Sequence, residues 1–330
     1  MIQLENLMFT GNYALLCQNF IHYKRSLGYA YDVRQCYSVK YLCDYLATHG
    51  GTVSGLSRDV VEGYIRHKGT ESPSTQSKRA YIIRQFGMYL TSLGYESYLP
   101  PYDCIKLDKS FVPYIYSKDE IAAIINESEK LQKVYQAPNS YLVYPMLLRI
   151  LFGCGLRVSE ALKLKEDDID LDNGTIHVEK SKFNNSRIVP MASGLWDKCR
   201  DYYNKADHYP ADGRYFFEVR PGVPYRRDSV YNRFRFFLEQ AGITHYGRGS
   251  GPRLHDARHT YSVYALEHMV QQGMDIYCAL PILSVYLGHR TIESTEKYVR
   301  LIPAFHQNII HSMEGMYDGL FPEVKNERKQ

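Results

Sequence analysis

The stretch "RLHDARHTYSVYAL", residues 253–266, holds two histidines, His255 and His259, four residues apart on an expected helix, with Arg258 directly before the second. This spacing places both imidazoles on one face of the helix, which is half of a helical zinc site. The same stretch suits a phosphate, because the guanidinium of Arg258 is planar, permanently charged and able to bind two phosphate oxygens. Which ligand this stretch binds, a metal or a phosphate, depends on the residues that the rest of the chain supplies.

The zinc interpretation lacks the residues that such a site requires. Helical zinc hydrolases have Glu directly after the first His, and Asp256 stands there in this chain. Arg258 would also place a permanent cation beside a dication. No nearby Glu or His has the spacing of a third ligand. The sequence therefore predicts no metal site at this helix, and His259 is expected to pack within the scaffold.

Other segments of the chain supply the further residues that a phosphate site requires. "GCGLRVSEAL" supplies Arg157 where two glycines lead into a helix. Two arginines aimed at the non-bridging oxygens would stabilise the charge of a pentacoordinate phosphorane. Phosphoryl transfer also needs a nucleophile and a proton donor for the leaving oxygen. "YLGHRTIESTEKYVRL" supplies His289 and, nine residues later, Tyr298, and the turn of an expected β-hairpin supplies Lys182.

Length and composition indicate a globular protein of about two domains. The chain has 330 residues, 45% of them apolar, and a net charge of +4, which by itself is weak evidence for a nucleic-acid partner. Its seven cysteines are irregularly spaced without a CxxC pair, so neither a zinc knuckle nor a disulfide framework is indicated. Without a signal peptide or a stretch of ~18 apolar residues, we expect a cytoplasmic protein with no membrane partner.

The first part of the chain, residues 1–110, is expected to be a helical domain. Four helical patterns occur between about residues 10 and 95, and Ser57 is a plausible N-cap of the third. The segment from about 95 to 116 has three prolines and no usable period, which is typical of a linker.

The second domain, residues 111–330, opens on the capping-box sequence "SKDE" at 117–120. "GTIHVEKS" and "RIVPM" predict a β-hairpin, and a helix is expected from Asp228 as N-cap to Gly242 as stop. The fold class is therefore mainly α with a small β-hairpin or sheet. Further helices are expected at 255–272, about 279–287, 292–301 and in an amphipathic tail with Phe305, Ile309, Ile310 and Met313.

The boxes "GLRVSE", "HDARHT" and "YLGHRTIESTEKY", together with the lysine hairpin, resemble the signature motifs of the tyrosine recombinase (phage integrase) family. The order Arg, Lys, His-x-x-Arg, His, Tyr is complete, and the resemblance covers about residues 115–310. It implies a SAM-like helical core-binding domain followed by a mixed α+β catalytic domain. It also implies a site-specific DNA recombinase, integrase- or transposase-like, that cleaves and rejoins DNA through a 3′-phosphotyrosyl intermediate without metal, ATP or another cofactor.

The resemblance assigns a role to each motif residue. Tyr298 matches the nucleophile, and Lys182 matches the general acid, with Lys180 as the competing assignment. Glu160 is expected to be structural, fixing the helix that carries Arg157. The remaining catalytic candidates bind the phosphate or assist proton transfer from the tyrosine: Arg157 and Arg258 as a phosphate clamp, His255 for proton transfer and His289 for a hydrogen bond to the phosphate.

The resemblance also implies partners: a double-stranded DNA recombination site, a second protomer on each site, a tetramer at synapsis, and possible accessory proteins. Basic residues at helix starts suit backbone phosphates, and a neighbouring Gln suits a base edge. The alternative is that these are solvated surface charges. The tail helix either docks on a neighbouring protomer or covers its own domain. The DNA-binding candidates are Gln76, Lys78, Arg79, Arg84, Arg226 and Arg227.

Two other functions share part of this pattern. A type IB topoisomerase-like enzyme uses the same chemistry to relax DNA without exchanging partners, and a catalytically inactive relative only binds DNA. When it is bound to DNA, we expect the protein to be associated with the nucleoid. The sequence leaves open the target site, the mobile element served, and whether Tyr298 acts in cis or in trans.

Overall fold

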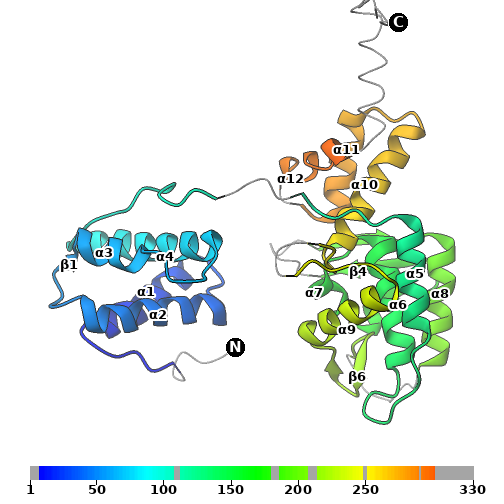
Figure 1. Cartoon of the computed structure of the whole chain (residues 1–330), viewed down its shortest axis with the longest axis horizontal. Coiled ribbons are helices and arrows are strands. Elements are labelled where there is room, and N and C mark those ends of the chain that lie inside the picture. The colour runs from blue at the N-terminus through cyan, green and yellow to red at the C-terminus, as the bar shows by residue number, and fades with distance from the viewer. Residues whose placement is uncertain are drawn as a thin grey trace, which may run out of the picture. The chain divides into compact units, whose positions relative to one another are not determined.

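The computed structural model describes residues 7–107, 112–179, 186–206, 214–247, 251–289 and 291–301. The chain divides into two compact units, residues 1–111 and 112–330, each with its own hydrophobic core (Figure 1). The expected tail helix and Lys182 both lie outside the described residues.

The first unit is a four-helix module, as the helical patterns predict. Ser57 caps the third helix by accepting a hydrogen bond from the Val60 amide. A short parallel pair, β1 (Gly55–Leu56) and β2 (Glu96–Ser97), joins the start of α3 to the end of α4. The helices are α1 (Ala14–Ser26), α2 (Val33–His49), α3 (Arg58–Ile65) and α4 (Pro73–Ser92).

Aromatic side chains fill the core of this unit. Phe20 of α1 and Phe86 of α4 pack edge to face with their ring centres 5.5 Å apart. Tyr13 is fully buried, and its hydroxyl donates a hydrogen bond of 2.6 Å to the Gly55 carbonyl. The burial of one face of α4 leaves Lys78 exposed on the opposite side, whereas Arg79 and Arg84 are half-buried.

The second unit is built around α6 (Ser140–Cys154), a helix that is apolar nearly all round and almost entirely buried. It contacts α5, α8 and α10 (Figure 1). Across the described parts of the chain, no helix combines the length and apolar character that a membrane span needs. The other α-helices of the unit are α5 (Lys118–Glu129), α7 (Val158–Ala161), α8 (Ser193–Lys205), α9 (Arg227–Gln240), α10 (Asp256–Gln271), α11 (Ile276–Leu287) and α12 (Glu293–Glu296).

The expected β-hairpin is present as an antiparallel pair in which Val178 lies opposite Arg187. A short third strand pairs with the free edge of the first hairpin strand and was not expected from the sequence. A separate two-strand hairpin before α9 was not expected either. The strands are β3 (Ile169–Asp170), β4 (Thr175–Val178) and β5 (Arg187–Pro190) in one sheet, and β6 (Glu218–Arg220) and β7 (Val223–Pro224) in the other.

Local sequence signals place most helix ends correctly, with two corrections. The capping box of Ser117 and Glu120 is formed. The helix α9 begins at Arg227, so Asp228 lies in its first turn instead of capping it. The helix expected over 292–301 is the four-residue α12 followed by a 3-10 turn at Val299–Leu301. Successive i to i+3 backbone hydrogen bonds tighten this segment, which keeps Thr295 and Tyr298 on one buried side.

Gly155 ends α6 in the left-handed conformation, with φ at +61°, two residues before Arg157. A Cβ at this position would lie 2.5 Å from a ring atom of Tyr261. We expect Gly155→Ala to lower the free energy of unfolding of the second unit by about 1–3 kcal/mol, through backbone strain and this clash. Urea unfolding followed by the fluorescence of Trp196, the single tryptophan, measures the effect.

The matched control is Gly194→Ala in α8, where an added Cβ meets nothing within 4 Å and φ is negative. This change should leave stability equal or slightly higher. Equal stability of the two variants would contradict the strain argument.

Candidate active site

Arg157 stands at the junction between α6 and α7 and is held there by Glu160. The backbone amide of Arg157 donates to Glu160 Oε2 at 3.0 Å, and its Nη1 donates to Glu160 Oε1 at 2.6 Å. This is the capping arrangement of a helix N-terminus, with the guanidinium added to it. Glu160 therefore positions Arg157, which is the structural role that the sequence predicts for it.

A second arginine, Arg187 at the start of β5, shares the same carboxylate. Its Nη2 donates to Glu160 Oε2 at 2.9 Å, and its Nε donates to the Tyr286 carbonyl at 2.8 Å. Burial alone would raise the pKa of Glu160, but the hydrogen bonds and charges of Arg187 and Arg157 outweigh it and bring the pKa down to about 2. Arg187 was not predicted from the sequence as a site residue. Its hydrogen bond to Glu160 connects the base of the hairpin to the segment that carries Arg157.

Arg258 is buried in α10, with only 3% of its surface exposed. Its Nη1 donates to the Gly155 carbonyl at 2.8 Å and its Nη2 to the Leu287 carbonyl at 2.6 Å. Arg157 in turn donates to the Gly288 carbonyl at 3.4 Å. Both guanidiniums therefore lie where the ends of α6 and α11 meet. Burial, and then the charge of Arg157, lower the pKa of Arg258 to about 10, which leaves it charged at neutral pH.

His289 and His255 flank this pair of arginines. His289 follows Gly288, the left-handed C-cap of α11, and its Nδ1 lies 2.8 Å from Thr295 Oγ1. Burial, and then the charges of Arg258 and Arg157, lower the pKa of His289 to about 3. The side chain of His255 is exposed at the start of α10, yet desolvation of its ring and the same two arginines lower its pKa to about 4. Both imidazoles are therefore neutral at neutral pH.

Tyr298 lies inside the site with 1% of its surface exposed, as part of the small core between α10 and α11. Its hydroxyl shares a hydrogen bond of 3.0 Å with Nδ1 of His259, and burial raises the pKa of Tyr298. From the sequence, His259 was expected to have only a scaffold role. Its position one turn after His255 on the same helix face was the signal that it also reaches the site.

Lys180 and Lys182 fall between β4 and β5 in the sequence, outside the described residues. The described base of that hairpin is joined to the site through Arg187. Another lysine, not predicted from the sequence, lies near Tyr298: the Lys297 Nζ is 5.1 Å from the centre of the Tyr298 ring. Burial, and then the charge of Arg258, lower the pKa of Lys297.

Residues 116–304, more than half of the chain, match the family model described as the phage integrase family. The chain belongs to the phage integrase family. It is a tyrosine recombinase.

Relatives with this family's names cover most of the recombinase. A putative integrase/recombinase of Sinorhizobium fredii is 25% identical over 307 residues, which are 91% of this chain and 96% of the relative. A tyrosine recombinase of Pseudothermotoga lettingae is 25% identical over 284 residues, 84% of this chain and 87% of the relative.

Solved structures share the fold of the recombinase at lower identity. The integrase of transposon Tn1549 in complex with transposon right end DNA aligns with a TM-score of 0.63 at 17% identity, covering 91% of this chain and 98% of that one. The XerH recombinase bound to its difH substrate aligns with a TM-score of 0.61 at 16% identity, covering 86% and 91%. These likenesses confirm the fold class.

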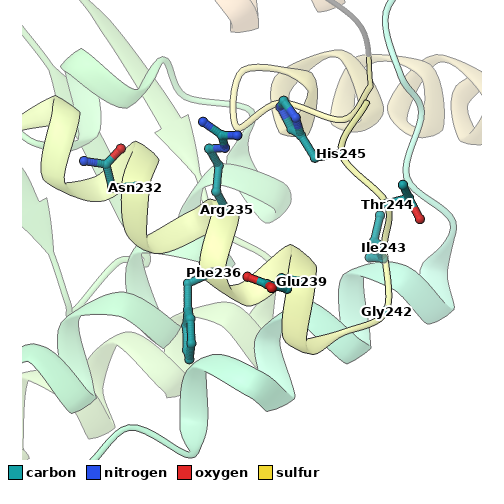
Figure 2. A pocket seen from close by; sticks show the side chains of 8 residues that line it. All are labelled: Asn232, Arg235, Phe236, Glu239, Gly242, Ile243, Thr244 and His245. Carbon is teal, nitrogen blue, oxygen red and sulfur yellow. The ribbon is translucent and has the colours of Figure 1, made fainter. Parts of the chain in front are cut away.

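Within the described residues of the recombinase, no group of three or more His, Cys, Asp or Glu is arranged to hold a metal ion. A surface hollow of about 680 Å³ lies along the second half of α9. Figure 2 shows Arg235, Glu239 and His245 among the residues that line it. A second hollow of about 710 Å³ lies between residues 133–139 and 218–221. Neither is lined by the arginines, the histidines or the tyrosine of the site.

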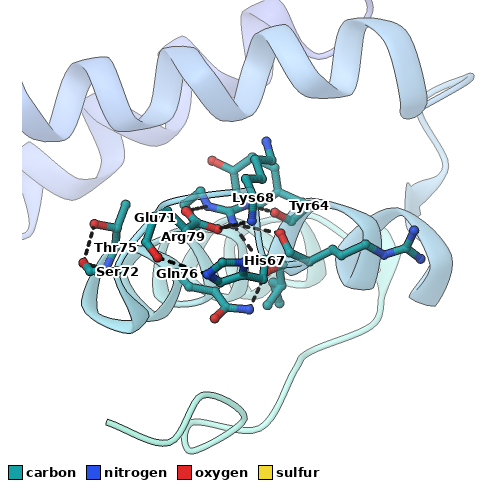
Figure 3. Close-up of polar contacts among 10 residues, drawn as sticks. Tyr64, His67, Lys68, Glu71, Ser72, Thr75, Gln76 and Arg79 are labelled. Carbon is teal, nitrogen blue, oxygen red and sulfur yellow. Dashed lines mark hydrogen bonds and ion pairs between the residues drawn. The ribbon is translucent and has the colours of Figure 1, made fainter. Parts of the chain in front are cut away.

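The six DNA-binding candidates differ in the exposure of their side chains and in whether those side chains bind other groups of the protein. Lys78 on α4 is exposed, and so are Arg226 and Arg227 at the start of α9. By contrast, Arg79 pairs with Glu71 and donates to backbone carbonyls at the end of α3 (Figure 3).

Two further candidates are also engaged within the first unit. Gln76 donates to the Ile65 carbonyl at 3.1 Å. Arg84 donates to the Pro100 carbonyl and lies over the Tyr102 ring at 3.9 Å. These contacts leave the assignment of Gln76, Arg79 and Arg84 to DNA a prediction, because a side chain with internal partners has to release them to bind a phosphate.

We expect Glu160→Gln to lower the free energy of unfolding by about 3 kcal/mol at neutral pH, because it removes the charge shared by two half-buried arginines. The pKa of Glu160 is about 2 in the folded chain and ordinarily 4.5, so its stabilisation is present above 4.5 and is lost as the pH falls toward 2. Urea unfolding across this range should show the two proteins converging as the pH falls.

A control for this change is Glu127→Gln, which breaks a surface ion pair with Lys130 on α5. It should cost less than about 1 kcal/mol. A constant difference between the wild type and Glu160→Gln from about pH 7 to pH 3 would contradict the assigned pKa.

Proposed function

We propose that this recombinase cleaves and rejoins duplex DNA at specific sites through a covalent 3′-phosphotyrosyl intermediate on Tyr298. The observation that carries the proposal is the meeting of Arg157, Arg258 and Tyr298 with His255 and His289 in one cluster. Within this cluster, the hydrogen bond from Arg157 to the Gly288 carbonyl joins residues that are 131 positions apart in the sequence. Two permanent cations beside a tyrosine hydroxyl suit attack on a phosphodiester.

In the proposed cleavage step, Tyr298 Oη forms a bond to the scissile phosphorus and the bond from phosphorus to the 5′ oxygen breaks. Arg157 and Arg258 bind the non-bridging oxygens, on which negative charge accumulates. Lys182, or Lys180 in its place, gives a proton to the 5′ oxygen. The reverse step, with a 5′ hydroxyl from the same or another duplex as nucleophile, rejoins the strand and frees Tyr298.

The histidines of the two motif boxes have complementary roles in this scheme. His255 assists proton transfer from Tyr298, and His289 donates a hydrogen bond to the phosphate. The contact of His289 with Thr295 fixes its ring. A neutral imidazole has one donor and one acceptor nitrogen, so each histidine can serve its role without carrying a charge.

This scheme requires neither ATP nor a divalent ion. The phosphotyrosine bond retains the free energy of the phosphodiester, so rejoining needs no other source of energy. The arginines carry out the charge stabilisation that a metal ion supplies in other phosphoryl transfers.

We further propose that the partner is a double-stranded recombination site bound by two protomers, with four protomers at synapsis. The Tn1549 integrase and XerH structures named above contain transposon end DNA and a difH site. In this scheme the first unit is the core DNA-binding domain. Exposed Lys78, Arg226 and Arg227 contact backbone phosphates.

Tyr298→Phe should abolish the covalent product without abolishing DNA binding, because only the attacking oxygen is removed. The measurement uses nicked suicide duplexes from the DNA that flanks the gene, in EDTA, with SDS gels to reveal a protein–DNA adduct. The expected result is an adduct with the wild-type protein and none with the variant. A metal-dependent adduct, or one that persists in Tyr298→Phe, would refute the mechanism.

The same substrates separate the other two functions. Relaxation of supercoiled DNA without a specific site, by a monomer, would identify a topoisomerase-like enzyme. DNA binding with no adduct on any flanking duplex would identify a DNA-binding protein.

Replacing both Arg226 and Arg227 with Ala should weaken DNA binding and reduce the slope of log K against log salt by up to about 2, because each phosphate that is no longer neutralised lowers the slope by about one. The control is Lys205→Ala, which removes an exposed cation at the end of α8 and should leave the slope unchanged. Fluorescence anisotropy between about 50 and 200 mM salt provides the measurement. An unchanged slope in the double variant would remove α9 from the DNA interface.

A further inference from the structure

The hydroxyl of Tyr298 shares a hydrogen bond with a histidine that has no role in the motif assignments above, and Ser262 of the same helix is a second side-chain partner. Tyr298 Oη and His259 Nδ1 are 3.0 Å apart, and their ring centres are 5.6 Å apart. Both side chains are buried, His259 with 7% and Tyr298 with 1% of their surfaces exposed. A buried hydroxyl with a well-formed hydrogen bond is already set up to exchange its proton with that partner.

The two histidines of α10 differ in what they reach. His255 is exposed, and its ring packs edge-on against His259 at 5.1 Å. His259 lies one helical turn further into the protein, between His255 and Tyr298. The geometry thus leaves His255 toward the solvent, where DNA would bind, and gives the tyrosine hydroxyl to His259.

We propose that His259 is a catalytic residue whose Nδ1 is the direct acceptor of the Tyr298 Oη proton during strand cleavage, so that His255 assists this transfer through its ring contact with His259. The inference rests on the proposed phosphotyrosyl function. The bond from Oη to phosphorus forms as the O–H proton moves to Nδ1. The bond to the 5′ oxygen breaks, and that oxygen takes a proton from the lysine general acid. In rejoining, the 5′ hydroxyl forms its bond to phosphorus and gives its proton to the lysine, while His259 returns its proton to Oη as the phosphotyrosine bond breaks.

The surroundings of His259 keep it neutral before DNA binds. Burial, and then the neighbouring His255 and the cations Lys297, Arg253 and Arg258, lower its pKa to about 3. A neutral ring with its proton on Nε2 presents Nδ1 as an acceptor to the tyrosine hydroxyl.

DNA binding changes this balance in the direction that the proton transfer needs. A phosphate held by Arg157 and Arg258 adds negative charge near the ring and offsets the cations that lower its pKa. The imidazolium formed in the reaction is therefore better stabilised with DNA present than in the free protein.

The test is the single-turnover rate of adduct formation on a suicide duplex at saturating protein, for the wild type, His259→Asn and His259→Phe. Asn keeps a small polar group near the position of Nδ1 but is not a proton acceptor at neutral pH, and Phe keeps the ring alone. Loss of a general base slows a reaction by about 100-fold or more. We expect both variants to fall by at least this factor, with the protein concentration for half-saturation unchanged.

A 5′-phosphorothiolate duplex separates base from acid. Sulfur leaves without a proton, so this substrate should restore the rate of Lys182→Ala, but it should not restore either His259 variant. The matched control for substitution on α10 is His268→Asn, an exposed histidine in the last turn of the same helix, expected to react like the wild type. Circular dichroism and DNA affinity verify that the variants fold.

Three outcomes would overturn the inference. His259→Asn at the wild-type rate would show that a hydrogen bond suffices and no proton is accepted. A variant faster than wild type would make His259 a restraint on the tyrosine. Rescue of the His259 variants by the sulfur substrate would place the residue on the leaving-group side. Failure of the wild-type protein to form any adduct would instead refute the proposed function itself, so the two failures are distinguishable.

Discussion

The site depends on the burial of one permanent positive charge, the guanidinium of Arg258. A buried cation is costly unless its donors are satisfied, and Arg258 satisfies two of them with the carbonyls of Gly155 and Leu287. Those carbonyls are free because each lies at the end of a helix, where the last carbonyls have no partner within the helix. One side chain therefore brings together the C-terminal ends of α6 and α11, and with them Arg157 and His289.

Glu160 supplies a negative charge that offsets the repulsion among these closely spaced cations. It binds Arg157 and Arg187 at once, and its low pKa keeps it ionised at all ordinary pH values. The histidines beside it respond to the remaining positive charge by staying neutral, since their pKa values are lowered. The result is a positively charged site with neutral imidazoles, an electrostatic arrangement that suits a phosphate anion.

Tyr298 belongs to the hydrophobic core as much as to the site. Tyr298 packs with Leu266 and Leu283 between α10 and α11, and its hydroxyl faces His259. Placing the reactive oxygen on a core side chain limits its motion, which is how enzymes hold reacting groups within hydrogen-bonding reach. The same packing links the histidines of α10 to the short α12 segment.

The sequence by itself determined what depends on neighbours in the chain: the four-helix module, the Ser117 capping box, the β-hairpin and the motif residues Arg157, Arg258 and Tyr298 with their order. Glycine positions, caps and hydrophobic periods act over a few residues, so they are visible in one dimension. The tertiary structure alone decided that Arg187 shares Glu160 and that His259 contacts Tyr298. These pairs are 27 and 39 residues apart, and their meeting follows from how α10, α11 and the hairpin pack, which no local pattern encodes.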